Sequence, residues 1–292
     1  MTAVALPEDL PTPTPPASTA QRRTRRKRLN PRILISGGFL AVIATSALFA
    51  PLLAPHDYSE MVGRPLAADG LLGTDDYGRD IFSRLIHAGR VSLGVSIAAV
   101  AIASTIGTVL GMAAGYLRGI TETLIMRGID VMLSFPAIVL AVAAVAALGP
   151  DLSNVVIVIG VLYIPRFARV VYGSALSVRS TEYVLAARSM GAGPLRIMFG
   201  TVLPNILAPV VVQTSLSLSF AIQVESGLSF LGLGAQPPLP SWGSMVSTGQ
   251  NFLAVQSILL IAPALVIAAT VLALNVLGDG LRDVLDPRRQ RT

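Results

Sequence analysis

The sequence predicts an all-α protein that crosses a membrane several times. Three observations predict this class: 53% of the residues are hydrophobic, only 13% are charged, and the mean hydropathy is +0.69. Soluble domains carry about 25% charged residues, so this chain has about half of the usual charge. It also has no cysteine, which excludes a disulfide framework, a thiolate zinc site and a cysteine nucleophile.

The first 30 residues are expected to form a disordered tail. Five prolines lie within the first 16 residues, and such a composition does not bury a core. A basic run from Arg22 to Arg28 follows. It is compatible with an export signal, but the many apolar runs after it favour a positively charged flank of a retained span.

Six apolar segments are long enough to cross a hydrocarbon core of about 30 Å, which needs about 20 helical residues. They cover about 33–54, 91–116, 124–148, 153–172, 206–231 and 254–277. We therefore expect four parts: a basic tail (1–30), a first transmembrane helix with an external loop (31–90), a transmembrane domain (91–278) interrupted by a polar loop (179–205), and a C-terminal tail (279–292).

The basic residues flank these six spans unequally. With the N-terminus inside, 18 of the 22 lie in the inside segments or in the adjoining inner parts of the spans, and four lie in the outside segments. Arginine and lysine concentrate on the cytoplasmic side of membrane spans, so both termini are expected to be cytoplasmic. Because membrane flanks explain the net charge of +6, no nucleic-acid partner is expected.

The second apolar segment carries three glycines, Gly107, Gly111 and Gly115, on one helix face. Glycines at this spacing let two helices approach closely in lipid. We interpret them as packing residues. Their packing partner could lie in this chain or in a sister subunit.

The 179–205 loop is a short polar interruption between two long apolar segments. A helix is expected from Glu182 to Met190, with Gly191 at its C-terminus in a positive-φ conformation. Leu203 and Pro204 are expected to restart the chain toward the membrane. An ordinary amphipathic helix at the membrane surface is the alternative interpretation.

This loop resembles the cytoplasmic coupling loop of bacterial ABC-importer permeases, with two alanines (Ala186, Ala187), a glycine after three intervening residues (Gly191) and a Leu-Pro pair after 11 more. From about residue 30 to 290 the chain is similar to the C-type permease subunit of dipeptide, oligopeptide and nickel importers. Four further blocks carry that likeness: Leu72–Asp80 with Ser83 and Arg84; Met126, Arg127, Asp130, Phe135 and Pro136; Glu225–Pro238 with Ser241–Gly243; and Asn275, Gly278–Asp283, Asp286 and Pro287.

The resemblance implies an ABC-importer permease fold in the bacterial cell membrane. It implies as partners a second homologous permease, one or two ABC ATPases and an extracytoplasmic peptide-binding protein. The residues implied to contact the ATPase are Glu182, Ala186, Ala187, Gly191, Leu203 and Pro204. The family often has glutamate at the position of Leu185 and isoleucine at that of Thr201, and Glu182 is expected to supply the acid here instead.

ATP hydrolysis is not expected of this chain itself. It lacks the G-x-x-x-x-G-K-[ST] phosphate-binding loop. We expect no cofactor in this chain, and ATP and Mg²⁺ are expected to bind to the partner ATPases. No arrangement typical of a membrane enzyme is present either.

Two acids lie within the predicted spans. Asp130 is one turn from Arg127, and a local ion pair that fixes the helix end is favoured over a proton relay. A place on the translocation path or at a subunit contact is the alternative for Asp130. Glu225 has no obvious local partner. It is expected either to line the translocation path, where it would contact substrate or a sister permease, or to be a hydrogen-bonded structural residue near Gly227.

Trp242 follows three prolines and is expected at the outer membrane interface, where aromatic residues collect. A contact with the binding protein is the alternative. The two histidines are 31 residues apart without a ligand cluster, so no metal site is predicted.

Two other functions remain as alternatives. A gradient-driven secondary transporter is disfavoured because no internal repeat and only two intramembrane acids are visible. An importer of nickel or haem would share this architecture, since the separate binding protein sets much of the specificity.

Overall fold

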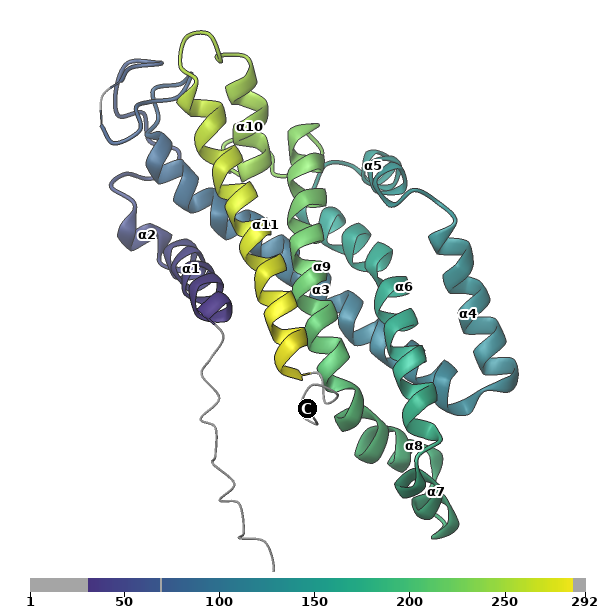
Figure 1. Cartoon of the computed structure of the whole chain (residues 1–292). Helices are drawn as coiled ribbons and strands as arrows, with labels where there is room; N and C mark the ends of the chain where they lie inside the picture. The colour runs from purple at the N-terminus through teal and green to yellow at the C-terminus, as the bar shows by residue number, and fades with distance from the viewer. Residues whose placement is uncertain (1–30, 69, 286–292) are drawn as a thin grey trace, which may run out of the picture.

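The computed structural model describes residues 31–68 and 70–285. The predicted tail 1–30 and the last residues of the predicted C-terminal tail lie outside these ranges. The described chain is almost entirely helical (Figure 1). Its elements are α1 Pro31–Leu48, α2 Ala50–Leu53, α3 Ile81–Leu117, α4 Gly119–Leu133, α5 Ala137–Leu148, α6 Leu152–Arg179, α7 Glu182–Ser189, α8 Pro194–Ile197, a π-helical turn η1 Met198–Val202, α9 Leu203–Phe230, α10 Trp242–Gln250 and α11 Ile258–Leu285.

Five of the described helical segments are long and apolar enough to cross a membrane, and α4 with α5 adds a sixth if the pair is counted as one span. The structure thus agrees with the predicted six spans if this pair counts as one, and the third span is then not one straight helix. Its two halves meet at 87°. The break falls at Ser134–Pro136 because proline has no backbone N–H and disfavours helical geometry in the residue before it.

The helix α3 begins at Ile81, ten residues before the predicted start of the second span at 91. Asp80 caps it by accepting hydrogen bonds from the backbone N–H and the hydroxyl of Ser83, at 2.8 and 2.6 Å. The apolar pattern marks only the part of the helix suited to the membrane, and the cap extends it outside that part.

The three glycines of α3 pack against α6 of the same chain. A Cβ on Gly107 would lie 2.5 Å from Cβ of Phe167, and one on Gly115 would lie 2.8 Å from the carbonyl oxygen of Tyr172. Gly111 is equally close to the carbonyl oxygen of Ala168. These glycines therefore let α3 and α6 pack closely, and their packing partner lies in this chain.

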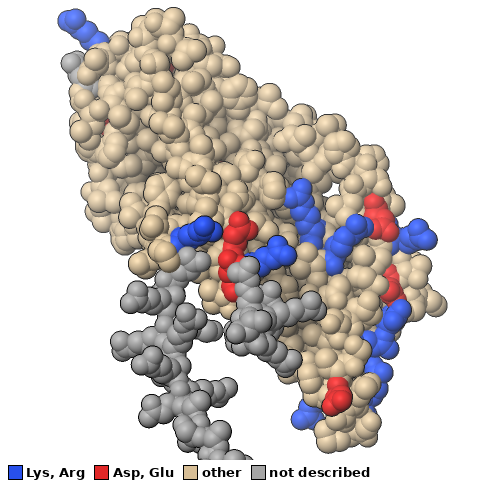
Figure 2. All heavy atoms as spheres, in the orientation of Figure 1, with Lys and Arg blue, Asp and Glu red and all other residues tan. Residues whose placement is uncertain are grey.

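Charged side chains are distributed unevenly over the surface (Figure 2). On the face shown, they gather on the lower half, toward the 179–205 loop and the end of α11, and are sparse above it. An uncharged belt beside a charged end is the pattern expected of a protein that crosses a bilayer.

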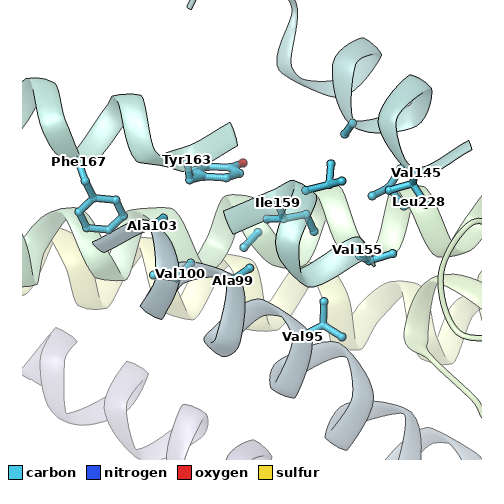
Figure 3. Close-up of a cluster of buried hydrophobic side chains, with 13 residues drawn as sticks. Val95, Ala99, Val100, Ala103, Val145, Val155, Ile159, Tyr163, Phe167 and Leu228 are labelled. Carbon is cyan, nitrogen blue, oxygen red and sulfur yellow. The ribbon is translucent and has the colours of Figure 1, made fainter. Parts of the chain in front are cut away.

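A core of buried side chains lies where α3, α5, α6 and α9 meet (Figure 3). Phe167 and Tyr163 of α6 face Ala103 and Val100 of α3 there. A second layer joins α9 to α11, where the hydroxyl of Ser215 donates to the carbonyl oxygen of Leu274 at 2.9 Å. The α3–α6 pair is thus the central axis of the described chain.

Candidate functional site

The 179–205 loop contains a short helix, α7, at Glu182–Ser189, close to the range predicted for it. The first turn carries an acid and the last turn an arginine, and both charges suit the helix dipole. The helix ends in a Schellman motif. The backbone N–H of Ala192 donates to the carbonyl of Ala187 at 3.1 Å, and that of Gly191 donates to the carbonyl of Arg188 at 3.0 Å. Gly191 has φ +80°, so the predicted positive φ is confirmed.

One side of the loop is anchored in an apolar cluster that we call the base. Val184, Ile197 and Met198 are buried in it. The guanidinium of Arg188 also lies 5.5 Å from the ring centroid of Tyr116. The remaining buried members of the base come from α3, α6, η1 and α9: Met112, Tyr116, Val171, Ala175, Val202 and Ile206. The base thus joins α7 to the ends of the central helix pair, α3 and α6.

The other side of the loop presents apolar side chains to the outside. Met190 is 81% exposed and Leu195 is 69% exposed. Together with Tyr183 and Leu185 they form what we call the outer face. An apolar patch that projects from the end of a molecule is typical of a protein interface.

The residues predicted to contact an ATPase divide between these two sides. Ala186 and Gly191 are exposed, and a Cβ on Gly191 would meet open space. Ala187 is half-buried and packs on the base, as does Leu203, whereas Pro204 is exposed. Glu182, in the first turn of α7, is also exposed.

The expectation that Leu203 and Pro204 restart the chain is wrong. The helix is continuous from Pro194 through η1 into α9. The π-helical turn at Met198–Val202 precedes the proline directly. Such a turn changes the hydrogen-bonding register, and this accommodates a residue without an N–H. The outgoing arm of the loop is therefore a rigid extension of a membrane helix.

Asp130 does not pair with Arg127 as expected. Its carboxylate accepts a hydrogen bond from the guanidinium of Arg169, on α6. A second polar link joins α4 to α6, since the hydroxyl of Tyr172 donates to Glu122. The helix α4 is thus held to α6 by polar contacts between side chains, and sequence spacing within α4 does not reveal them.

Glu225 is fully buried in the described chain, with 0% of its surface exposed. Its carboxylate accepts hydrogen bonds from Ser229 at 2.8 Å and from Ser226 at 3.4 Å. These contacts favour the structural interpretation over one in which Glu225 lines a path.

Trp242 is not at the surface, because its side chain is 1% exposed. It packs on Gly89, where a Cβ would lie 3.0 Å from the indole ring. The indole N–H donates to the carbonyl of Leu85 at 3.1 Å. The interfacial position expected for it is thus corrected, and no surface of this side chain is available to a binding protein.

Asp75 is a structural residue that the sequence analysis missed. It is buried and accepts backbone hydrogen bonds from Tyr77 and Arg79, both at 2.9 Å. Its carboxylate also pairs with the side chains of Arg79 and Arg84, at 2.7 and 3.3 Å. Burial, reinforced by the negative charge of Asp75, raises the pKa of the neighbouring Asp76. An acid followed by arginines four and nine residues later was the available signal.

Arg166 is a second residue without an assigned role in the sequence analysis. It follows Pro165 in the middle of α6, and its guanidinium lies 4.9 Å from the ring centroids of both Tyr163 and Phe220. No carboxylate of the residues that the structure describes pairs with it. An arginine inside an apolar run was the available signal.

Comparison with known families gives two matches that together cover most of the chain. The sequence model of the family described as binding-protein-dependent transport system inner membrane component matches residues 107–291. That of the N-terminal TM domain of oligopeptide transport permease C matches residues 18–69.

Individual relatives agree with these matches. The chain is 44% identical over 260 residues to the di/tripeptide transport system permease protein of Pseudomonas aeruginosa, covering 86% of each chain. It is 40% identical over 277 residues to a glutathione transport system permease protein of Pectobacterium atrosepticum, covering 92% of each. Among solved structures, an inward-facing MetNI methionine ABC transporter has a similar fold, with a TM-score of 0.58, 17% identity, and coverage of 70% of this chain and 96% of that chain.

Proposed function

The chain belongs to the family of inner membrane components of binding-protein-dependent transport systems, and we propose that it forms half of the translocation path of an ATP-driven importer of short peptides. It is a multi-pass permease of the bacterial inner membrane. Separate ATPases power it, and an extracytoplasmic binding protein delivers the peptide.

The 179–205 loop is the observation that carries this proposal. A motor subunit can move a permease only through a contact that is stiff on the permease side and open on the motor side. The anchored base and the exposed outer face meet these two needs. Glu182, Ala186 and Gly191 lie at the exposed side and contact the ATPase, while Ala187 and Leu203 hold the loop to the base.

The same proposal fixes the orientation. The ATPases bind ATP and Mg²⁺ in the cytoplasm, so the 179–205 loop and both termini lie on that side. The uneven basic flanks support this arrangement.

A second, homologous permease completes the path. The broken α4–α5 pair supports this part of the proposal, because its apolar side chains are exposed in the single chain: Leu124, Val131, Phe135 and Val139. They are covered by the second permease or by lipid, whereas the polar side chains between α4 and α6 turn toward the path.

The substrate class is proposed from the relatives. Their names give di/tripeptides and glutathione, which is itself a short peptide. Nickel complexes and haem are the competing cargoes.

The proposal is tested by reconstituting the chain with its second permease, ATPases and binding protein in liposomes. We expect uptake of a labelled tripeptide that needs ATP on the ATPase side and is unaffected by collapse of the proton and sodium gradients. Uptake that follows a gradient without ATP would identify a secondary transporter. ATP-driven uptake of a nickel chelate or haem, but of no peptide, would reassign the cargo.

A further inference from the structure

Arg166 lies within a membrane-spanning helix, where a charged side chain costs free energy. It is near the centre of the 28-residue helix α6, about 20 Å from either end at 1.5 Å per residue. Within the predicted span 153–172 it lies about 5 Å to the cytoplasmic side of the midpoint, at 1.5 Å per residue, and so inside a hydrocarbon core about 30 Å thick. Ionisable side chains at such a depth face a path or another protein, not lipid, and mark functional sites by default.

The contacts of Arg166 leave its hydrogen-bonding edge free. Tyr163 and Phe220, each 4.9 Å from the guanidinium carbon, interact with it through their rings. Ring contacts do not use the five N–H donors of the guanidinium. Since no carboxylate of the described residues pairs with Arg166, these N–H donors can bind a carboxylate from another molecule.

The surroundings of Arg166 are polar and open. Arg169, one turn further along α6, is paired with Asp130 and half-exposed. Phe220 is 43% exposed on α9, and Gln223, one turn further on, is also exposed. One surface thus holds an occupied ion pair, a free guanidinium and an exposed aromatic ring.

We infer that Arg166 binds the terminal carboxylate of a peptide in transit. The planar fork of arginine matches a carboxylate with two parallel hydrogen bonds. Every unmodified linear peptide carries this group whatever its side chains, so the contact suits a carrier of varied peptides, and the two rings offer apolar surface to the adjoining residue. This inference rests on the proposed function.

The test compares a tripeptide that has a free carboxylate with the same tripeptide as its C-terminal amide, in liposomes that hold the complete transporter. The ratio of their uptake rates is measured for the wild type, Arg166→Gln and Arg166→Lys. Because all variants use the same binding protein, its own preference cancels when the ratios are compared. Arg127→Gln, an exposed arginine of α4 without an ion pair in the described chain, is the matched control.

We expect Arg166→Gln to lower the carboxylate-to-amide ratio by about tenfold, as loss of a charge-assisted contact predicts. Arg166→Lys should give an intermediate ratio, and Arg127→Gln the wild-type ratio. An unchanged ratio in Arg166→Gln, with both peptides slowed alike, would overturn the inference and leave a structural role. Loss of the second permease on purification of both Arg166 variants would instead place its carboxylate partner in that subunit. If the wild type moves another cargo and no peptide, the proposed function fails first.

Discussion

Both ends of the molecule expose apolar side chains, among them Met190 at one end and Met61 and Val255 at the other, but the two ends are anchored differently. At the 179–205 loop, apolar side chains such as Met190 and Leu195 are left exposed on an anchored base. At the other end, the 54–80 loop and α10 are held by buried contacts. Asp75 forms ion pairs with Arg79 and Arg84 there, and the side chain of Trp242 is buried against α3.

This difference in anchoring shows what a substitution at each end would disturb. A segment held by a buried ion cluster loses stability when one charged partner is removed. A segment that rests on a small apolar base, with apolar side chains exposed beyond that base, presents a surface suited to a protein partner. Substitutions at the two ends should therefore fail differently, in stability at one end and in coupling at the other.

The largest effect on stability is expected from Asp75→Asn at the end that holds the buried ion cluster. The change leaves Arg79 and Arg84 buried without their shared carboxylate. The free energy of unfolding should fall by about 3–5 kcal/mol, measured as a denaturation midpoint in detergent. Glu60→Gln, at an exposed acid of the same loop, should have almost no effect. A fall of under about 1 kcal/mol for Asp75→Asn would mean that the cluster is not structural.

A smaller effect on stability, with a large one on coupling, is expected from Val184→Ala in the base. Losing buried methyl groups should cost about 1.5–2 kcal/mol and loosen α7. ATPase activity should then persist with much less transport per ATP. Val255→Ala, at an exposed valine of the other end, provides the matched control. Tight coupling in Val184→Ala would show that the anchor is dispensable.

Gly191→Ala isolates the backbone geometry of the loop. A Cβ there meets nothing within 4 Å, so only the φ of +80° opposes it. The cost should be about 1 kcal/mol. Gly193→Ala, at φ −68° and equally open, should cost nothing comparable. Equal melting temperatures for the two variants would rule out a strained helix end.

The smallest effect is expected from Asp76→Asn, and its sign depends on pH. A pKa raised by burial means that the ionised form is disfavoured in the folded state. At neutral pH asparagine should therefore be neutral or slightly stabilising, by under about 0.5 kcal/mol. The advantage should vanish below about pH 4, where the aspartate is protonated.

Asp57→Asn provides the contrast, because hydrogen bonds from Ser59 lower the pKa of that exposed carboxyl. Asp57→Asn should therefore lower the melting temperature at neutral pH, and this loss relative to the wild type should shrink as the pH falls and the aspartate is protonated. Parallel pH profiles for the two variants would contradict this assignment.

The sequence predicts the parts of the fold that depend on neighbouring residues. The α7 helix and its terminal glycine follow from local spacing, and the six spans follow from the length of the apolar runs. The α3 cap at Asp80 was not predicted, because the apolar pattern begins ten residues after the start of the helix.

The parts that sequence analysis missed depend on residues that are distant in the chain. Trp242 is buried because Gly89, about 150 residues earlier, leaves room for its ring. Asp130 pairs with Arg169 across two helices, and Arg166 meets a phenylalanine of α9. No periodicity within one helix specifies such contacts.

The most direct test of the central claim is co-purification of the ATPase with the tagged permease from mild detergent. Two matched acidic substitutions at exposed residues are compared, Ala186→Glu on α7 and Met61→Glu in the 54–80 loop. The account predicts that Ala186→Glu loses most of the ATPase while the permease melts normally, and that Met61→Glu retains it. Full retention of the ATPase by Ala186→Glu would contradict the assignment of the 179–205 loop as the motor contact.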